Sequence, residues 1–298
     1  MNSIKHIAVI GAGTMGNGIA HVFAQNGFEV QLIDISSDAL DKGMQTISKN
    51  LDRMLAKGAI TEPGKSEILS RIAPQTDFAK GLAGAELVVE AASEDLDLKL
   101  SIFRQLDALC APTTLLASNT SSISITRIGS VTLRPDKVIG MHFMNPVPMM
   151  NLVEIIRGYS TSEETANTIS QLSIKLGKTP TAVEDYPGFV ANRILMPMIN
   201  EAVETLYTGV AGVGEIDTVM KLGMAHPMGP LQLADFIGLD VCLSIMMVLY
   251  DGFKNPKYAP CPLLVKMVAA GKLGVKSGEG FYEYSESRKA EKIARQFS

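Results

Sequence analysis

Two side chains suited to acid–base chemistry, His142 and Glu154, lie in apolar stretches of the sequence. His142 ends the run VIGMH, and Glu154 is the lone carboxylate in LVEII. A carboxylate is costly to bury unless a cation or a hydrogen-bond donor pairs with it, and His142 is the natural partner if the two segments lie close together. Such a pair would fix the imidazole tautomer and make His142 a better base. The alternative is a core histidine that is hydrogen-bonded to the backbone, but an acid in a nearby apolar run favours a catalytic role for His142.

A third polar segment, Ser118-Asn119-Thr120-Ser121-Ser122, follows a short strand predicted over 114–117. Open α/β sheets bind ligands at the carboxyl ends of their parallel strands, so this hydroxyl cluster lies where a substrate is expected. For most of these side chains, the simpler interpretation is a cap for the helical turn over 123–128.

A glycine motif near the N-terminus predicts a dinucleotide site. Gly11, Gly13 and Gly16, with Ala12, Thr14 and Met15 between them, follow a predicted strand and open a predicted helix. The glycines permit a tight turn, close approach of a pyrophosphate and close helix–strand packing, with the anion at the helix N-terminus. Asp34 ends the next strand, where it can accept both ribose hydroxyls and repel a 2′-phosphate, so NAD is favoured over NADP. FAD competes on the motif alone, and a glycine turn without a ligand is the alternative.

The elements that would position these residues alternate along residues 1–186. Strands are predicted over 6–10, 29–34, 86–92, 114–117 and 138–142, with an antiparallel edge from 152–156 and 180–183. Helices are predicted over 15–26, between the strands at 86–92 and 114–117, and in an inserted hairpin over 37–57 and 65–72, with Ser37 as N-cap. This alternation is typical of a doubly wound, mainly parallel α/β sheet of the Rossmann type.

The composition changes at Tyr186-Pro187-Gly188, where a proline pushes the preceding residue out of the helical region. Beyond it, helical patterns cover 190–207, 215–222, 231–250 and 262–270, with almost no strand signal. We therefore predict a smaller all-α domain over residues 187–298. The run over 231–250 is too apolar to be a freely exposed helix.

Composition excludes several classes of protein. The 298 residues are 46% hydrophobic and 19% charged, with a net charge of −4, which argues against nucleic-acid binding. No apolar run reaches the roughly 18 residues of a membrane span. The three cysteines show no CxxC or Cys/His spacing, so neither a disulfide framework nor a metal site is expected. We expect a cytoplasmic protein without membrane or nucleic-acid partners.

The chain resembles the L-3-hydroxyacyl-CoA dehydrogenase family, and most of all its single-function bacterial 3-hydroxybutyryl-CoA members. The similarity covers essentially the whole chain, through motifs in one order: GAGTMG (11–16), VVEAASE (88–94), SNTSS (118–122), HFMNP (142–146), LVEII (152–156), PGFVANRIL (187–195), KLGMAHPMGPLQLADFIGLD (221–240) and KSGEGFYEY (276–284). The resemblance implies a homodimer that pairs through its helical domains.

The resemblance also implies a role for individual residues. It makes His142 the general base and Glu154 the group that orients it, with Ser121 and Asn192 bonded to the reacting oxygen. It adds cofactor contacts to those of Gly11–Gly16 and Asp34, namely Glu94, Lys99, Asn145 and Lys276. Flavin chemistry does not need a base with an orienting acid at a secondary alcohol, so NAD is preferred to FAD. Asn192 follows the domain boundary directly, so the resemblance places the active site across an interdomain cleft.

A basic stripe on the predicted long helix suggests a site for the CoA moiety. Lys49, Arg53 and Lys57 recur every four residues and so share one helix face. Such a face can hold nucleotide phosphates, although a solvated helix face is an equal alternative. The resemblance favours Lys57 and the neighbourhood of Asn50, a position where some relatives have serine.

The expected activity is reversible, NAD-dependent oxidation of the 3-hydroxyl of (S)-3-hydroxyacyl-CoA, with a short acyl chain such as 3-hydroxybutyryl. One alternative is a dehydrogenase of a hydroxy acid that is not bound to CoA, but such enzymes commonly use a lysine base. The other is a non-catalytic NAD-binding protein, which would have no need for Ser121, His142, Glu154 and Asn192 together.

Overall fold

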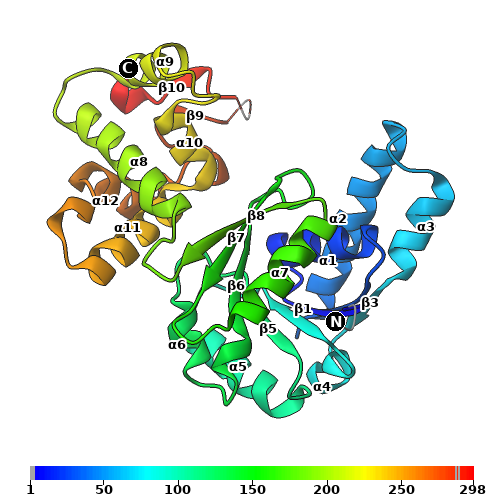
Figure 1. Cartoon of the computed structure of the whole chain (residues 1–298). Coiled ribbons are helices and arrows are strands. Elements are labelled where there is room, and N and C mark those ends of the chain that lie inside the picture. Colours follow the sequence, from blue (N-terminus) through cyan, green and yellow to red (C-terminus); the bar gives the residue numbers. More distant parts are fainter. Residues whose placement is uncertain (1–3, 286, 288) are drawn as a thin grey trace. The chain divides into compact units, whose positions relative to one another are not determined.

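The computed structural model describes residues 4–285, 287 and 289–298. It divides into two compact units, Met1–Tyr186 and Pro187–Ser298, which are described separately. Figure 1 shows the sheet with its helices in the first unit and the mainly helical second unit.

The first unit is built on an eight-stranded sheet in the order β3-β2-β1-β4-β5-β6-β7-β8. The strands from β3 to β6 are parallel neighbours, β7 runs antiparallel to β6, and β8 runs parallel to β7. Their bounds are β1 His6–Ile10, β2 Glu29–Ile33, β3 Ile72–Gln75, β4 Leu87–Glu90, β5 Leu115–Ser118, β6 Val138–Phe143, β7 Leu152–Arg157 and β8 Thr179–Glu184. This arrangement confirms the predicted Rossmann-type sheet and its antiparallel edge.

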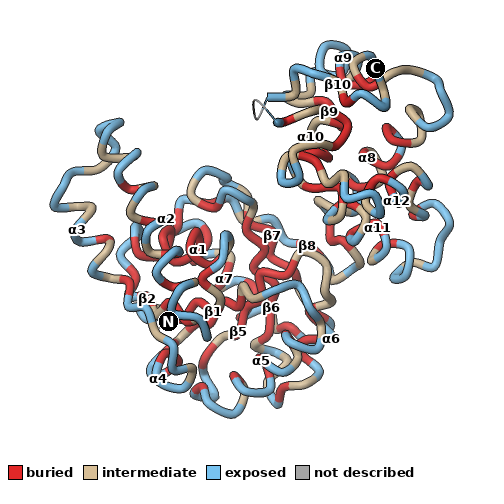
Figure 2. The backbone as a smooth tube through the Cα atoms, turned by 180° about the vertical axis from the view of Figure 1, so that it is seen from behind, coloured by how far each residue is buried: buried red, intermediate tan, exposed pale blue. Residues whose placement is uncertain are grey.

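Helices cover both faces of this sheet. Their bounds are α1 Thr14–Gln25, α2 Ser37–Ala56, α3 Glu62–Ser70, α4 Phe78–Leu82, α5 Leu96–Leu109, α6 Ile125–Gly129 and α7 Glu163–Lys175. One core joins α1, α2 and α7 to alternate residues of the strands. Its strand residues include Ile7, Val9, Leu87, Val89, Met141, Phe143, Val153 and Ile155, and its helical residues include Ile19, Phe23 and Ile169. On the other face α6 lies so close that a Cβ at Gly140 would meet Ile125. Figure 2 shows buried central strands, with exposed residues concentrated on the outer surfaces of the surrounding helices and loops.

The structure differs locally from the sequence prediction. It adds β3, which the sequence did not predict because its Pro74 is a strand breaker. The strand tolerates a proline because it lies at the sheet edge. The inserted hairpin is α2 and α3, and the cap of α2 is Ser36 rather than Ser37, with the Ser36 hydroxyl accepting the Ala39 N–H at 3.2 Å.

The second unit is mainly helical. Its helices are α8 Ala191–Tyr207, α9 Val213–Thr218, α10 Pro230–Ile237, α11 Leu239–Phe253 and α12 Pro262–Ala269. The single helix predicted over 231–250 was wrong: the chain bends by 97° between α10 and α11. Gly238 at the break has a φ of +102°, which L-residues with side chains rarely adopt. The all-α prediction also needs correction, because two short strands, β9 Tyr282–Glu283 and β10 Lys292–Ile293, pair antiparallel.

A buried carboxylate fastens the C-terminal segment to α10. Asp235 accepts the N–H groups of Phe281 and Tyr282, each at 3.0 Å, and the hydroxyl of Tyr284 at 3.1 Å. Burial raises the pKa of Asp235 to about 6 despite these bonds. The segment that follows α12 is therefore part of the packed unit, since its backbone supplies the donors that this acid needs.

Among the described residues, no single helix is both long and apolar enough to cross a bilayer. The bent pair α10 and α11 has the required length and apolar composition only when the two helices are taken together. In the same residues, no group of three or more His, Cys, Asp or Glu side chains could hold a metal ion.

His21 on α1 makes the stability of the first unit sensitive to acid. Its side chain is fully buried, and neither ring nitrogen has a hydrogen-bond partner among the described residues. Burial, aided by the charge of Lys178, lowers the pKa of His21 to about 4. In the unfolded chain, His21 has an ordinary pKa near 6.5. The neutral ring therefore contributes fully to the free energy of unfolding above that pH, and the contribution is lost as the pH falls towards 4. This loss approaches about 3 kcal/mol.

We expect the urea concentration at the unfolding midpoint to fall between pH 7 and pH 4.5, and to fall less in a His21→Leu variant, which has no group to protonate there. Asp235 acts in the opposite direction, because its raised pKa favours the folded state in acid, so the comparison of variant with wild type is the informative one. Equal pH sensitivity in the two proteins would show that His21 does not titrate in this way.

Candidate active site

The glycine loop between β1 and α1 has the shape that a pyrophosphate needs. Gly11 has a φ of +94°, and a Cβ there would lie 2.6 Å from the carbonyl oxygen of Ala91. A Cβ on Gly16 would lie 1.7 Å from the carbonyl oxygen of Gly11, whereas one on Gly13 would meet nothing within 4 Å. Gly11 and Gly16 therefore allow tight backbone packing, and Gly13 leaves open space beside the helix end.

The N-terminus of α1 is suited to an anion. Its cap residue, Gly13, makes no side-chain cap bond, and the first turn holds no acidic residue. The first N–H groups of a helix lack intrahelical partners and carry a positive partial charge. Thr14 and Met15 belong to this first turn, while Ala12 is buried against the core. The loop therefore fits the phosphates of a dinucleotide.

Asp34 lies immediately after β2, beside the glycine loop. Its carboxylate accepts the N–H of Ala12 at 2.8 Å and that of Ser36 at 3.0 Å. These bonds hold the half-buried carboxylate at the strand end, and each oxygen still has a lone pair for a further donor. A ribose diol can supply those donors.

His142 and Glu154 are direct partners across two strands. They face each other in the antiparallel register of β6 and β7, and His142 Nδ1 lies 2.8 Å from the Glu154 carboxylate. Both residues are buried, with exposed fractions of 8% and 2%. The predicted proximity is therefore observed, and the bond at Nδ1 places the basic lone pair on Nε2.

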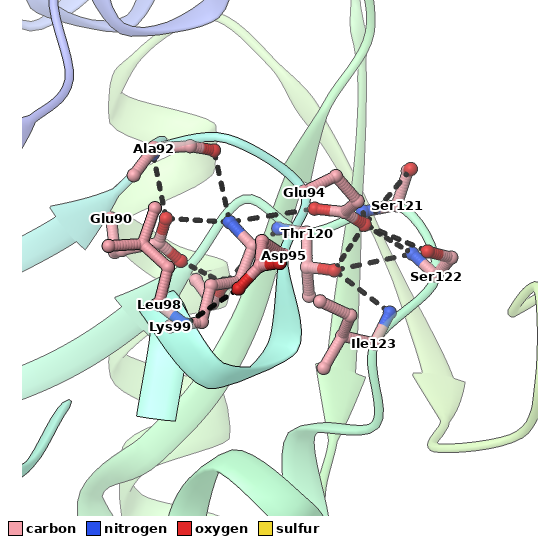
Figure 3. Close-up of polar contacts among 11 residues, drawn as sticks. Glu90, Ala92, Glu94, Asp95, Leu98, Lys99, Thr120, Ser121, Ser122 and Ile123 are labelled. Atoms are coloured by element: carbon pink, nitrogen blue, oxygen red, sulfur yellow. Dashed lines mark hydrogen bonds and ion pairs between the residues drawn. The ribbon is translucent and has the colours of Figure 1, made fainter. Parts of the chain in front are cut away.

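The loop after β5 closes around Glu94. The Glu94 carboxylate accepts the Thr120 hydroxyl at 2.6 Å, the N–H groups of Ser121 and Ser122 at 2.9 and 3.0 Å, and their hydroxyls at 3.3 and 2.9 Å. Burial alone would raise the pKa of Glu94, but the Lys99 ammonium and these donors hold it below its usual range. Figure 3 shows the loop wrapped around this carboxylate. The Ser121 hydroxyl is therefore directed at Glu94 in this structure.

Lys99 on α5 is buried next to Glu94. Its ammonium lies 2.6 Å from Glu90, 3.2 Å from the carbonyl oxygen of Ala92 and 3.5 Å from Glu94. Only 1% of the Lys99 side chain is exposed. Three acceptors match the three N–H groups of an ammonium, so a direct contact with a cofactor would require this cluster to rearrange.

Three residues of this region were not predicted as site residues, namely Glu90, Ser118 and Asn119. Ser118 and Asn119 were noted only as members of a hydroxyl cluster. In the structure, the Asn119 side chain accepts the N–H of Phe143 at 2.9 Å and so ties the loop after β5 to the end of β6, beside His142. Glu90 is a lone carboxylate in the apolar run LVVEAA, the same signal that singled out Glu154.

Residues predicted at the edge of the site lie on separate elements. Asn145 is exposed just after β6. Lys49, Arg53 and Lys57 are exposed along α2 and its C-cap, and Arg53 donates to the Asn50 side chain at 3.3 Å. This agrees with a basic helix face, but the structure leaves its role as a CoA site a prediction.

Two further predicted residues belong to the second unit. Asn192 lies in the first turn of α8, and Lys276 lies in a short 3₁₀ helix, Val275–Ser277, where it forms an ion pair with Asp240. The contact of Asn192 with the reacting oxygen and the contact of Lys276 with the cofactor stay predictions.

The chain is similar in sequence and structure to known proteins, and these similarities indicate its family. The family profile "3-hydroxyacyl-CoA dehydrogenase, NAD binding domain" matches residues 6–186, and that for the C-terminal domain of the same family matches residues 188–284. The chain is 55% identical over 281 residues to a 3-hydroxybutyryl-CoA dehydrogenase of Bradyrhizobium diazoefficiens, covering 94% of this chain and 96% of the relative. It is 44% identical to the human mitochondrial hydroxyacyl-coenzyme A dehydrogenase, covering 94% and 91%. The crystal structure of (S)-3-hydroxybutyryl-CoA dehydrogenase from Ralstonia eutropha superposes with a TM-score of 0.93 at 51% identity, covering 95% of this chain and 100% of that one.

The first unit is thus the NAD-binding domain of an oxidoreductase that acts on a CH–OH group. The chain belongs to the 3-hydroxyacyl-CoA dehydrogenase family, and its cofactor is NAD.

Proposed function

We propose that this enzyme oxidises the 3-hydroxyl of short-chain (S)-3-hydroxyacyl-CoA, above all 3-hydroxybutyryl-CoA, and reduces the 3-oxo product in reverse. The observation that carries the proposal is the buried pair of His142 and Glu154 at a strand end, 2.8 Å apart, in the same unit as the glycine loop. The relatives named above, which cover nearly the whole chain, support the choice of substrate.

In the proposed mechanism, His142 Nε2 takes the proton of the 3-hydroxyl. NAD, which the glycine loop and Asp34 would hold, would supply the acceptor for the hydride that leaves C3. Glu154, already bonded to Nδ1, keeps the imidazole in the required tautomer and stabilises the imidazolium that forms. Burial of both side chains strengthens their attraction, because little water screens it.

Two polar groups are proposed to hold the substrate oxygen as it becomes a carbonyl, Ser121 and Asn192. The Ser121 hydroxyl, which donates to Glu94 at 3.3 Å, would turn to the substrate when it binds. Glu94, Asp34, Asn145, Lys99 and Lys276 are proposed to line the cofactor site. Asn50, Arg53 and Lys57 are proposed to contact the CoA moiety.

The substrate class is tested by comparing acetoacetyl-CoA with free acetoacetate as oxidants of NADH. We expect turnover with the CoA ester and kcat/KM at least about 100-fold lower with the free acid, since the nucleotide moiety contributes much of the binding. NADPH in place of NADH should also be a poor reductant, because Asp34 repels a 2′-phosphate. Equal rates with the two oxo compounds would favour a dehydrogenase of free hydroxy acids, and no turnover with either would favour a non-catalytic NAD-binding protein.

We propose a homodimer that pairs through the second unit and functions in the cytoplasm. An apolar groove of about 420 Å³ lies against α8 and α9, lined by residues that include Met198, Ala202, Val210, Ile216 and Val219. Leu222, three residues after the lining residue Val219, is 81% exposed. Exposed apolar surface of this kind often marks an interface. The three cysteines are buried and free, which is consistent with a reducing compartment.

A light-scattering measurement of the purified protein should give about twice the chain mass of 31.9 kDa. Leu222→Asp should shift it towards one chain, because a charge on the interface would have to be desolvated. The matched control is Leu133→Asp, which alters an even more exposed leucine in the first unit and should leave the dimer intact. A wild-type protein with the mass of one chain would contradict the proposal.

A further inference from the structure

Glu90 is a fully buried carboxylate that the mechanism above does not use. It is the last residue of β4, and none of its surface is exposed. One oxygen accepts the N–H of Ala92 at 2.7 Å and the Lys99 ammonium at 2.6 Å, and the other accepts the Ser118 hydroxyl at 2.6 Å. Glu90 therefore joins three segments at the carboxyl edge of the sheet: the loop after β4, the first turn of α5 and the end of β5.

Each of these segments supports a part of the proposed cofactor site. The loop after β4 packs under the glycine loop, since a Cβ on Gly11 would lie 2.6 Å from the carbonyl oxygen of Ala91. The Ser118 hydroxyl in turn accepts the N–H of Thr120 at 3.2 Å, and Thr120 donates to Glu94 at 2.6 Å. A chain of bonds therefore runs from Glu90 to the Glu94 carboxylate.

The charges of this cluster also link Glu90 to Glu94. The Lys99 ammonium lies between two carboxylates, nearer to Glu90 at 2.6 Å than to Glu94 at 3.5 Å. Figure 3 shows Lys99 between Glu90 and Glu94. Without the charge of Glu90, a buried ammonium would retain Glu94 as its counter-ion and would draw that carboxylate away from the N–H groups of Ser121 and Ser122.

We propose that Glu90 is a positioning residue for the cofactor site: by neutralising Lys99 and bonding Ser118, it holds Glu94 and the loop after β5 where the bound dinucleotide meets them. This rests on the proposed contact between Glu94 and the cofactor. Glu90 itself does not touch substrate or cofactor, so its effect should fall on cofactor affinity and not on the chemical step.

The test is Glu90→Gln, which keeps the size of the side chain and removes its charge. We expect the Kd for NADH, measured by the fluorescence of the bound cofactor, and the KM for NAD to rise about tenfold, with kcat at saturating NAD within about twofold of wild type. Ser118→Ala removes one of the Glu90 bonds and leaves its charge, so we expect the same pattern with a rise of about threefold. Ser118→Ala therefore still tests the inference if the Glu90→Gln variant does not fold.

The matched control is Asp107→Asn, which breaks the ion pair between Asp107 and Arg134. Asp107 is a nearly buried acid near the other end of α5, so its loss should lower the thermal midpoint and leave the Kd for NADH unchanged. A Glu90→Gln variant with wild-type Kd and KM would overturn the inference, as would parallel losses of cofactor affinity in Glu90→Gln and Asp107→Asn. Failure of the wild-type protein to bind NADH would instead contradict the proposed function.

Discussion

Replacing His142 by glutamine should lower kcat for oxidation of 3-hydroxybutyryl-CoA by about 10³-fold and leave the Kd for NADH within about twofold. Glutamine has nearly the reach of histidine and can still bond to Glu154, but it has no basic nitrogen to take the hydroxyl proton. The glycine loop and Asp34, which are proposed to bind the cofactor, follow β1 and β2, whereas His142 lies on β6. Steady-state rates and NADH fluorescence titration measure the two effects separately.

The control for this variant is His6→Gln. His6 is an exposed histidine at the first residue of β1, so it lies at the amino ends of the parallel strands, away from the site at their carboxyl ends. Its replacement should leave kcat and the Kd for NADH unchanged. Near-normal turnover in His142→Gln would rule out His142 as the base. Loss of NADH binding together with turnover would show a structural role in the domain instead.

Glu154→Gln should lower kcat by about 10²-fold, with KM for substrate and cofactor little changed. The amide oxygen can still accept a bond from Nδ1, so the ring keeps its orientation. The charge that stabilises the imidazolium is lost, and the low dielectric around a pair that is 8% and 2% exposed makes that charge important. The variant therefore separates the two effects of Glu154 on His142, the orientation of the ring and the charge that stabilises the imidazolium.

The matched control is Glu163→Gln, which breaks the exposed ion pair with Arg157 at the end of the same strand, β7. It should leave kcat unchanged, because exposed pairs contribute little. An unaltered rate in Glu154→Gln would mean that His142 needs only orientation. A rise in KM for NAD without a fall in kcat would place Glu154 in cofactor binding instead.

Local patterns in the sequence were sufficient for much of the fold. Strands that are buried on both faces are short, continuous apolar runs, and this predicted the strands from β1 to β6 apart from β3. The glycine spacing predicted the turn into α1, because the conformations and close contacts at Gly11 and Gly16 exclude a side chain. The helical break at Gly238 and the strand containing Pro74 were missed, because one glycine or one proline is ambiguous until its neighbours are known.

His142 and Glu154 could be singled out as chemical groups from their residue types and apolar surroundings alone, since a buried acid needs a partner wherever it lies. Their pairing, however, depends on the antiparallel register of β6 and β7, and a shift of one residue would place the two side chains on opposite faces of the sheet. The arrangement of Glu90, Lys99, Ser118 and Glu94 likewise arises only when β4, α5 and β5 pack together. Local propensity acts between neighbours in the chain, whereas hydrogen bonds and ion pairs between distant segments form only after the sheet has brought those segments within reach.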